Sequence, residues 1–120
     1  MPGYAKRTIR LDFPELTEEG ADPVYVEIRN PKTLPQHLLL RRDVTAEQLK
    51  TDPHADWASS YELLSRIIVD WHVFDATSLG EEQPLLTLPA DEDKVGRLPQ
   101  EIADAIATKI VEAQNPGAGA

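Results

Sequence analysis

Two short segments near the N-terminus alternate between apolar and polar residues. Residues 8–13 (TIRLDF) place Ile9, Leu11 and Phe13 on one side, and residues 24–29 (VYVEIR) repeat the pattern. A period of two is typical of half-buried β-strands. The ten residues between them hold two prolines, one glycine and four acidic residues, which predicts a loop. The pattern therefore predicts an N-terminal β-hairpin, whose apolar face needs cover from helices or from another copy.

The strongest periodicity begins at Asp56 and runs through DWASSYELLSRIIVDWHVF. Steps of four and three residues separate its large apolar side chains, which fall on one face of a helix. Glu62, Arg66 and Asp70 line the opposite face at a spacing that allows ion pairs. The segment predicts a long central helix of about 25 Å. Its apolar stripe consists of Trp57, Tyr61, Leu64, Ile68 and Trp71.

Weaker signals surround this helix. Asp43 or Thr45 could cap a short helix over AEQLK, and residues 81–93 form a proline-bounded connector. ADEDKVGR predicts one or two helical turns, and residues 99–114 predict a C-terminal helix that buries isoleucines at i+4 spacing. Residues 115–120 are expected to be a flexible tail. The predicted fold is a single α+β, mainly helical domain over residues 1–114, with hairpin, long central helix, short helix and C-terminal helix in that order.

Composition narrows the class of protein. The chain has 120 residues, of which 41% are apolar and 28% charged, as in a small soluble domain. It contains no cysteine, which excludes disulfides, thiolate catalysis and zinc fingers. We expect a cytoplasmic protein without membrane contact, since no signal-peptide core and no apolar run of about 20 residues is present.

Charge is distributed unevenly. Residues 1–50 carry eight basic and eight acidic side chains, so the second half holds the entire net charge of −9. An acidic half repels phosphate and argues against nucleic-acid binding. The excess either serves solubility, or forms a surface that keeps copies apart or meets a basic partner.

The stretch IIVDWHVFD at residues 67–75 raises the question of chemistry. On a helix Asp70 and His72 would point to different sides, and two weak ligands do not fix a metal. Ser59 and Ser60 lack a nucleophile-elbow motif, and the chain has no nucleotide-binding glycine motif. We therefore expect no catalytic activity, no metal and no cofactor.

The apolar stripe has two interpretations. Its five residues form the core, or part of the stripe stays exposed as a docking surface, because Trp and Tyr are common interface anchors. A hairpin and two main helices offer little area to bury five large side chains, which favours self-association or a partner. The stripe residues are accordingly the candidate partner-binding residues.

Four segments, in their order and their residue patterns, resemble the sequences of a known family. The segments are RLDFPEL, VYVEIRNPKTLP, YELLSRIIVDWHVFDATS and PLLTLPADEDKVGRLPQEIADAIATKIVEA. Together they resemble the tail assembly chaperones of long-tailed bacteriophages, particularly those of actinobacterial hosts, over residues 8–114. The features that carry the likeness are W-x-V-x-D at Trp71, Val73 and Asp75, the Pro-Leu-Leu-x-Leu-Pro connector, and Leu98-Pro99 before an alanine-rich helix.

The resemblance implies a non-catalytic protein that binds the tape measure protein, keeps it soluble and hands it over as tail tube subunits polymerise around it. It also implies a homo-oligomer, a longer form made by ribosomal frameshifting, possible contact with the tail tube protein, and a place in the host cytoplasm rather than the mature virion. A different class stays open. The chain could be a small structural virion protein, such as a head–tail joining or tail-tube-end ring subunit.

Overall fold

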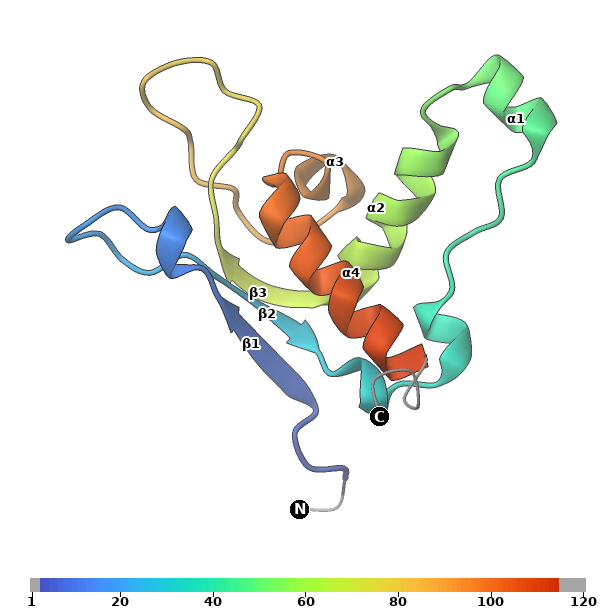
Figure 1. Cartoon of the computed structure of the whole chain (residues 1–120), viewed down its shortest axis with the longest axis horizontal. Helices are drawn as coiled ribbons and strands as arrows, with labels where there is room; N and C mark the ends of the chain where they lie inside the picture. Colours follow the sequence, from blue (N-terminus) through green and yellow to red (C-terminus); the bar gives the residue numbers. More distant parts are fainter. Residues whose placement is uncertain (1–2, 115–120) are drawn as a thin grey trace.

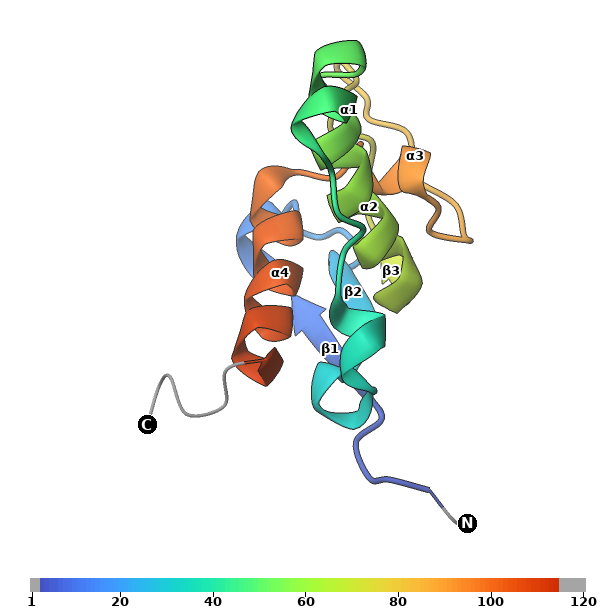
Figure 2. The ribbon, with the colours of Figure 1, turned by 90° about the vertical axis from the view of Figure 1, so that its right-hand side faces the viewer.

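Two N-terminal strands form one side of a three-stranded antiparallel sheet in the computed structural model, which describes residues 3–114 (Figures 1 and 2). β1 (Thr8–Asp12) pairs with β2 (Tyr25–Arg29), with Ile9 opposite Ile28 and Leu11 opposite Val26. The alternating segments are thus strands, as the sequence predicts. They do not stand as a separate hairpin, because β3 (Ile68–His72) pairs with the other edge of β2.

The predicted long central helix is wrong over its last third. α2 (Ala55–Ile67) ends at Ile67, and the chain passes directly into β3 with Ile68 extended at φ −70° and ψ 128°. The β-branched run Ile67-Ile68-Val69 favours a strand over a helix. β2 also has a second edge whose backbone groups need partners, which β3 supplies. One irregularity between Glu27 and Ile28 leaves Val69 unpaired in the β3 register, as in a β-bulge.

Short helices follow local sequence signals. α1 (Ala46–Thr51) begins at Thr45, which forms a capping box with Gln48, so Thr45 rather than Asp43 is the cap. α3 (Glu92–Val95) is capped by the Asp91 carboxylate. Single 3-10 turns occupy Pro14–Leu16, Pro31–Thr33 and Gln36–Leu39. The predicted tail at 115–120 lies outside the described residues.

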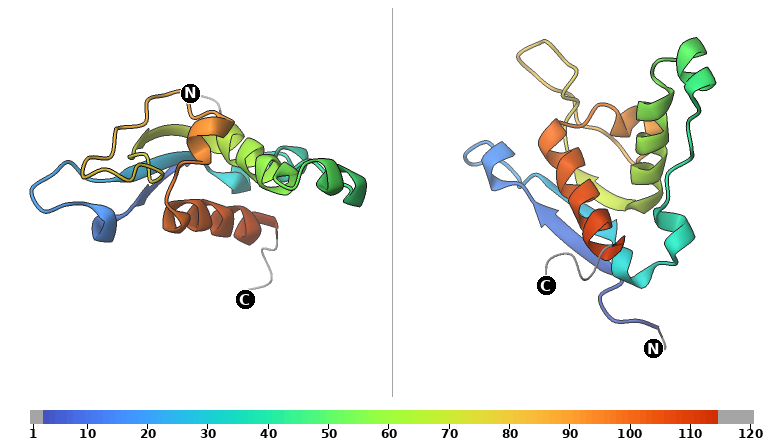
Figure 3. Two further views of the ribbon diagram at one scale, coloured as in Figure 1. Left: turned by 90° about the horizontal axis from the view of Figure 1, so that it is seen from above. Right: turned by 45° about the vertical axis from the view of Figure 1, so that its right-hand side comes forward.

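The core lies between the sheet and α4 (Gln100–Gln114), which runs along one face of the sheet (Figure 3). α4 buries Ile102, Ile106 and Ile110 at the predicted i+4 spacing. From the sheet, Val26 and Ile28 are completely buried. The predicted α+β class is therefore confirmed. Within residues 3–114, no helix has the combined length and apolarity that crossing a membrane requires.

The opposite face of the sheet is polar. The Tyr25 hydroxyl donates a 2.7 Å hydrogen bond to the Asp70 carboxylate, and the Arg10 guanidinium lies 4.0 Å from the Tyr25 ring centroid. The hydrogen bond to Asp70 raises the pKa of the Tyr25 phenol above its usual value. This face therefore ties all three strands together through side chains without adding to the core.

Candidate partner-binding surface

The five residues of the predicted stripe do not share one surface. Trp57, Tyr61 and Leu64 lie on α2, whereas Ile68 and Trp71 lie on β3. Trp57 is 61% exposed and Tyr61 is half-buried. Leu64, Ile68 and Trp71 are 6–7% exposed and belong to the core cluster. The single stripe is wrong because the helix that would align these residues ends before Ile68.

Trp71 is a core residue. It lies opposite Val26 in the sheet, and its indole Nε1–H donates a 3.0 Å hydrogen bond to the Leu86 carbonyl. That bond ties β3 to the connector that follows it. For Trp71 and Ile68 the core interpretation holds, and neither is placed to bind a partner on the folded chain.

Trp57 and Tyr61 form a small exposed aromatic pair. Their ring centroids are 6.4 Å apart, and with His54 and Ala58 they line a hollow of about 390 Å³. Tyr61 also packs on the backbone that follows α3, where a Cβ added to Gly96 would lie 3.1 Å from the Tyr61 ring. Trp57 is therefore the member of the predicted set that is most accessible for contact with a partner.

A second surface lies on another side of α2. It is an apolar groove of about 510 Å³ between α2, α4 and segment 39–43, which is extended after Leu39. Leu64 contributes to its floor, and Leu40 on the rim is 51% exposed. The remaining lining residues are Leu39, Arg41, Asp43, Ser60, Leu63, Ala107, Ile110, Val111 and Gln114. We call this surface the α2–α4 groove.

Hydrogen bonds from both helices hold the extended wall of the groove in place. Arg66 of α2 donates to the carbonyls of Leu38 and Leu40 at 3.0 and 3.3 Å. Gln114 of α4 donates to the Leu39 carbonyl at 3.1 Å. Ser59, fully buried, donates to the Arg42 carbonyl. The wall is a fixed part of the fold, so the groove exists before any partner binds.

The groove was missed by the sequence patterns because its wall has no periodicity. LLL at residues 38–40 fits a buried strand or a turn of helix, yet these residues form the end of a 3-10 turn and an extended chain. The one sequence feature that indicates this surface is the run of three leucines at 38–40, which lies outside any predicted helix or strand. The sequence offers Ser59 only as a candidate nucleophile, whereas in the structure its hydroxyl holds the wall of the groove.

The acidic and histidine side chains of residues 67–75 do not converge. Asp70 accepts a hydrogen bond from Tyr25 on the polar face of the sheet, while the His72 ring packs edge-on against Phe74. Asp75 is directed into the turn that follows β3. Among residues 3–114, no three His, Cys, Asp or Glu side chains come together as metal ligands.

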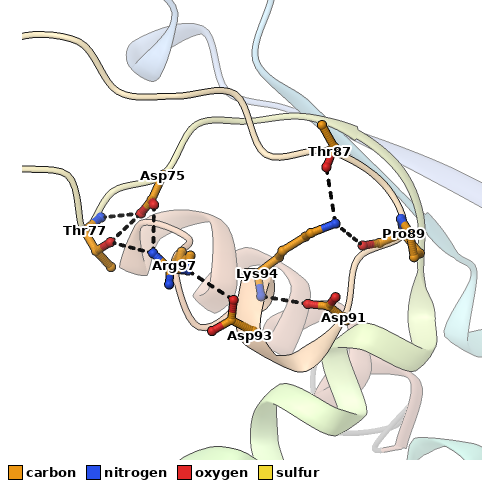
Figure 4. A network of polar contacts seen from close by, with 8 residues as sticks. All are labelled: Asp75, Thr77, Thr87, Pro89, Asp91, Asp93, Lys94 and Arg97. Atoms are coloured by element: carbon orange, nitrogen blue, oxygen red, sulfur yellow. Dashed lines mark hydrogen bonds and ion pairs between the residues drawn. The ribbon is translucent and has the colours of Figure 1, made fainter.

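Asp75 organises this turn (Figure 4). Its carboxylate accepts hydrogen bonds from the Thr77 backbone and hydroxyl and forms a 2.9 Å ion pair with Arg97. The Thr77 hydroxyl, followed by the Thr77 N–H and Arg97, holds the pKa of Asp75 below its usual value. Arg97 also pairs with Asp93 of the α3 region at 3.4 Å. The network holds the turn against α3, and its polar groups form hydrogen bonds and ion pairs with one another.

Comparisons with protein-family models, with curated proteins and with solved structures found no match. The likeness to tail assembly chaperones therefore stays a prediction carried by sequence pattern. The two features of the structure that bear on partner binding are the α2–α4 groove and the exposed Trp57.

Proposed function

We propose that this chain is a non-catalytic phage tail assembly chaperone that covers apolar helical segments of the tape measure protein and keeps that protein soluble. The observation that carries the proposal is the α2–α4 groove, an apolar channel with a preformed wall. An amphipathic helix binds such a groove through anchors at i, i+3, i+4 and i+7. A tape measure protein, as a long apolar and helix-prone chain, would offer many segments of this kind.

The chemistry of the groove supports binding rather than catalysis. Its apolar lining includes Leu40, Leu63, Leu64 and Ile110. Among its polar members, Arg41 is paired with Asp56 at 3.1 Å and with Ser60 at 2.9 Å. These pairs lie toward the α1 end of α2, so polar groups border the apolar groove at that end. Polar groups at the edge of an apolar surface are typical of protein–protein interfaces.

Co-expression with the partner tests the proposal. The partner is the very long helical reading frame that the resemblance places downstream of this gene. We expect it to be insoluble alone and soluble when this chain is present, with many copies of the chain retained in a pull-down. The proposal is overturned if the long protein stays insoluble and this chain stays unbound.

Two groove variants make the test specific to the site. Leu40→Glu and Ala107→Glu place a carboxylate in the groove at exposed positions, so the fold should tolerate them. Leu79→Glu and Ala46→Glu are matched controls at exposed positions outside the groove. We expect the groove variants to lose the partner and the controls to retain it. If all four variants retain the partner equally, the groove is not the binding site.

The alternative, a structural virion protein, predicts that the chain is present in finished particles. A chaperone leaves before the particle is complete, whereas a ring subunit remains. Mass spectrometry of purified particles separates the two. Stoichiometric recovery of this chain from particles would favour the ring subunit.

A further inference from the structure

The two ends of the sheet carry opposite charge. The start of β1 and the end of β2 lie at one end, and the β1–β2 loop with residues 75–85 lies at the other (Figure 1). At the first end, Lys6, Arg7 and Arg29 line a hollow of about 740 Å³. We call it the basic end. It stands out because the whole chain has a net charge of −9.

The other end is acidic. Glu18, Asp22, Glu81 and Glu82 line a hollow of about 380 Å³ there, which we call the acidic end. Within residues 3–114, neither these four carboxylates nor the three cations of the basic end form an ion pair. The other five arginines, by contrast, all form ion pairs within the chain. Both ends therefore present charge that the monomer does not neutralise.

Each end also has exposed apolar side chains beside its charged residues. At the basic end Tyr4 is 78% and Val69 38% exposed. At the acidic end Leu16 is 36% and Phe74 37% exposed. Val69 lies at the irregularity in the β2–β3 register, where it has no partner residue on β2. Protein–protein interfaces combine apolar side chains with polar and charged ones, as each end does.

We propose that the basic end of one copy of this chain binds the acidic end of another, giving a head-to-tail array. Charge complementarity selects this occupant, because each end offers the sign of charge that the other lacks. The two surfaces are different patches, so the contact is heterologous and repeats along a ring or an open filament. The inference goes beyond the proposed function and does not need it, since the chain alone should associate.

Exposed charges set the strength of this contact. Exposed ion pairs contribute at most about 1 kcal/mol each, and salt screens them over a length of about 8 Å at physiological ionic strength. Association should therefore be weak, concentration-dependent and reduced by salt. Sedimentation velocity of the purified chain at 50 and 500 mM salt measures it. We expect the average mass to rise above the 13.4 kDa monomer at low salt and to return toward it at high salt.

Charge reversal at each end provides the decisive comparison. Lys6→Glu with Arg29→Glu makes both ends acidic. Glu18→Lys, Glu81→Lys and Glu82→Lys together leave Asp22 as the one carboxylate among the four acidic positions, so both ends become basic. Each of these two variants should associate at least about tenfold more weakly than the natural chain, since like charges would then face each other. Lys50→Glu and Glu101→Lys reverse exposed charges outside both ends and should leave association unchanged.

Mixing the two charge-reversal variants gives the sharpest result. Every end of one variant is then complementary to every end of the other, so the mixture should assemble although neither variant does so alone. The proposal is overturned if the natural chain is monomeric at low salt, or if it forms an oligomer that charge reversal does not weaken. It is also overturned if the mixture fails to assemble. A failed pull-down of the tape measure protein would leave these results unaffected, so the two proposals can fail separately.

Discussion

The two tryptophans of this chain should differ sharply in what they contribute to stability. Trp71 is 6% exposed and donates a hydrogen bond to the Leu86 carbonyl, whereas Trp57 is 61% exposed. Truncating a buried Trp to Ala costs about 3–5 kcal/mol, and a carbonyl left unpaired adds to that cost. Trp71→Ala should therefore remove about 4 kcal/mol from a domain whose total stability is about 5–15 kcal/mol. Trp57→Ala should cost about 1 kcal/mol or less, because it removes mainly exposed surface and one aromatic contact.

Urea unfolding followed by far-UV circular dichroism measures both effects. With a slope of about 1.5 kcal/mol per M, a loss of 4 kcal/mol lowers the midpoint by roughly 2–3 M. Trp57→Ala should shift it by well under 1 M on the same slope. The slope must stay the same in both variants, because a changed slope would report a different change in exposed surface rather than a change in stability alone.

The comparison also tests the junction between α2 and β3. On an unbroken helix over residues 56–74, the two tryptophans would lie on nearly the same face, and their truncation would have similar cost. Losses that agree to within about 1 kcal/mol, or a larger loss for Trp57→Ala, would refute the passage from helix to strand at Ile67.

Two further predictions concern polar groups in the fold. Because the folded-state pKa of Asp75 lies below its usual value near 3.8, its ionised form adds stability above about pH 4 that is lost as pH falls through the folded pKa. The advantage of the natural chain over Asp75→Asn should therefore shrink in urea unfolding between pH 7 and pH 3, and a constant difference would contradict the assigned contacts. Ser59→Ala leaves the Arg42 carbonyl without its partner and should cost about 1–2 kcal/mol, with faster amide exchange over residues 39–43. Ser65→Ala, which removes a local bond to the Glu62 carbonyl, is the control and should leave that exchange unchanged.

Local sequence patterns predict the elements that are determined by residues close to one another in the sequence. The strands β1 and β2 follow from alternation, and the buried isoleucines of α4 follow from their i+4 spacing, because one face of each element meets a single core. The cap at Thr45 follows from Thr-x-x-Gln, which satisfies backbone groups within four residues. In each case the residues that determine the element are close in sequence.

The α2–β3 junction could not be predicted in this way. Residues 68–71 continue the helical spacing of Trp57, Tyr61 and Leu64, so periodicity alone extends the helix. The competing interaction is the free edge of β2, some forty residues earlier in the chain, and no local pattern reveals it. The α2–α4 groove was missed for the same reason. Its wall at 39–43 is held by Arg66 and Gln114, which are far from it in sequence.

The surfaces assigned to the two proposals do not overlap. The groove is built from residues 39–43, 60–64 and 107–114, and none of these lines the basic or the acidic end. A copy joined to neighbours at both ends would therefore still present an open groove. A long partner would then strengthen the weak head-to-tail association. Each copy bound to the partner through its groove raises the effective concentration of the next copy along that partner. If that coupling exists, the partner should promote assembly at salt concentrations where the chain alone is monomeric. Groove variants should abolish that promotion while leaving association at low salt intact.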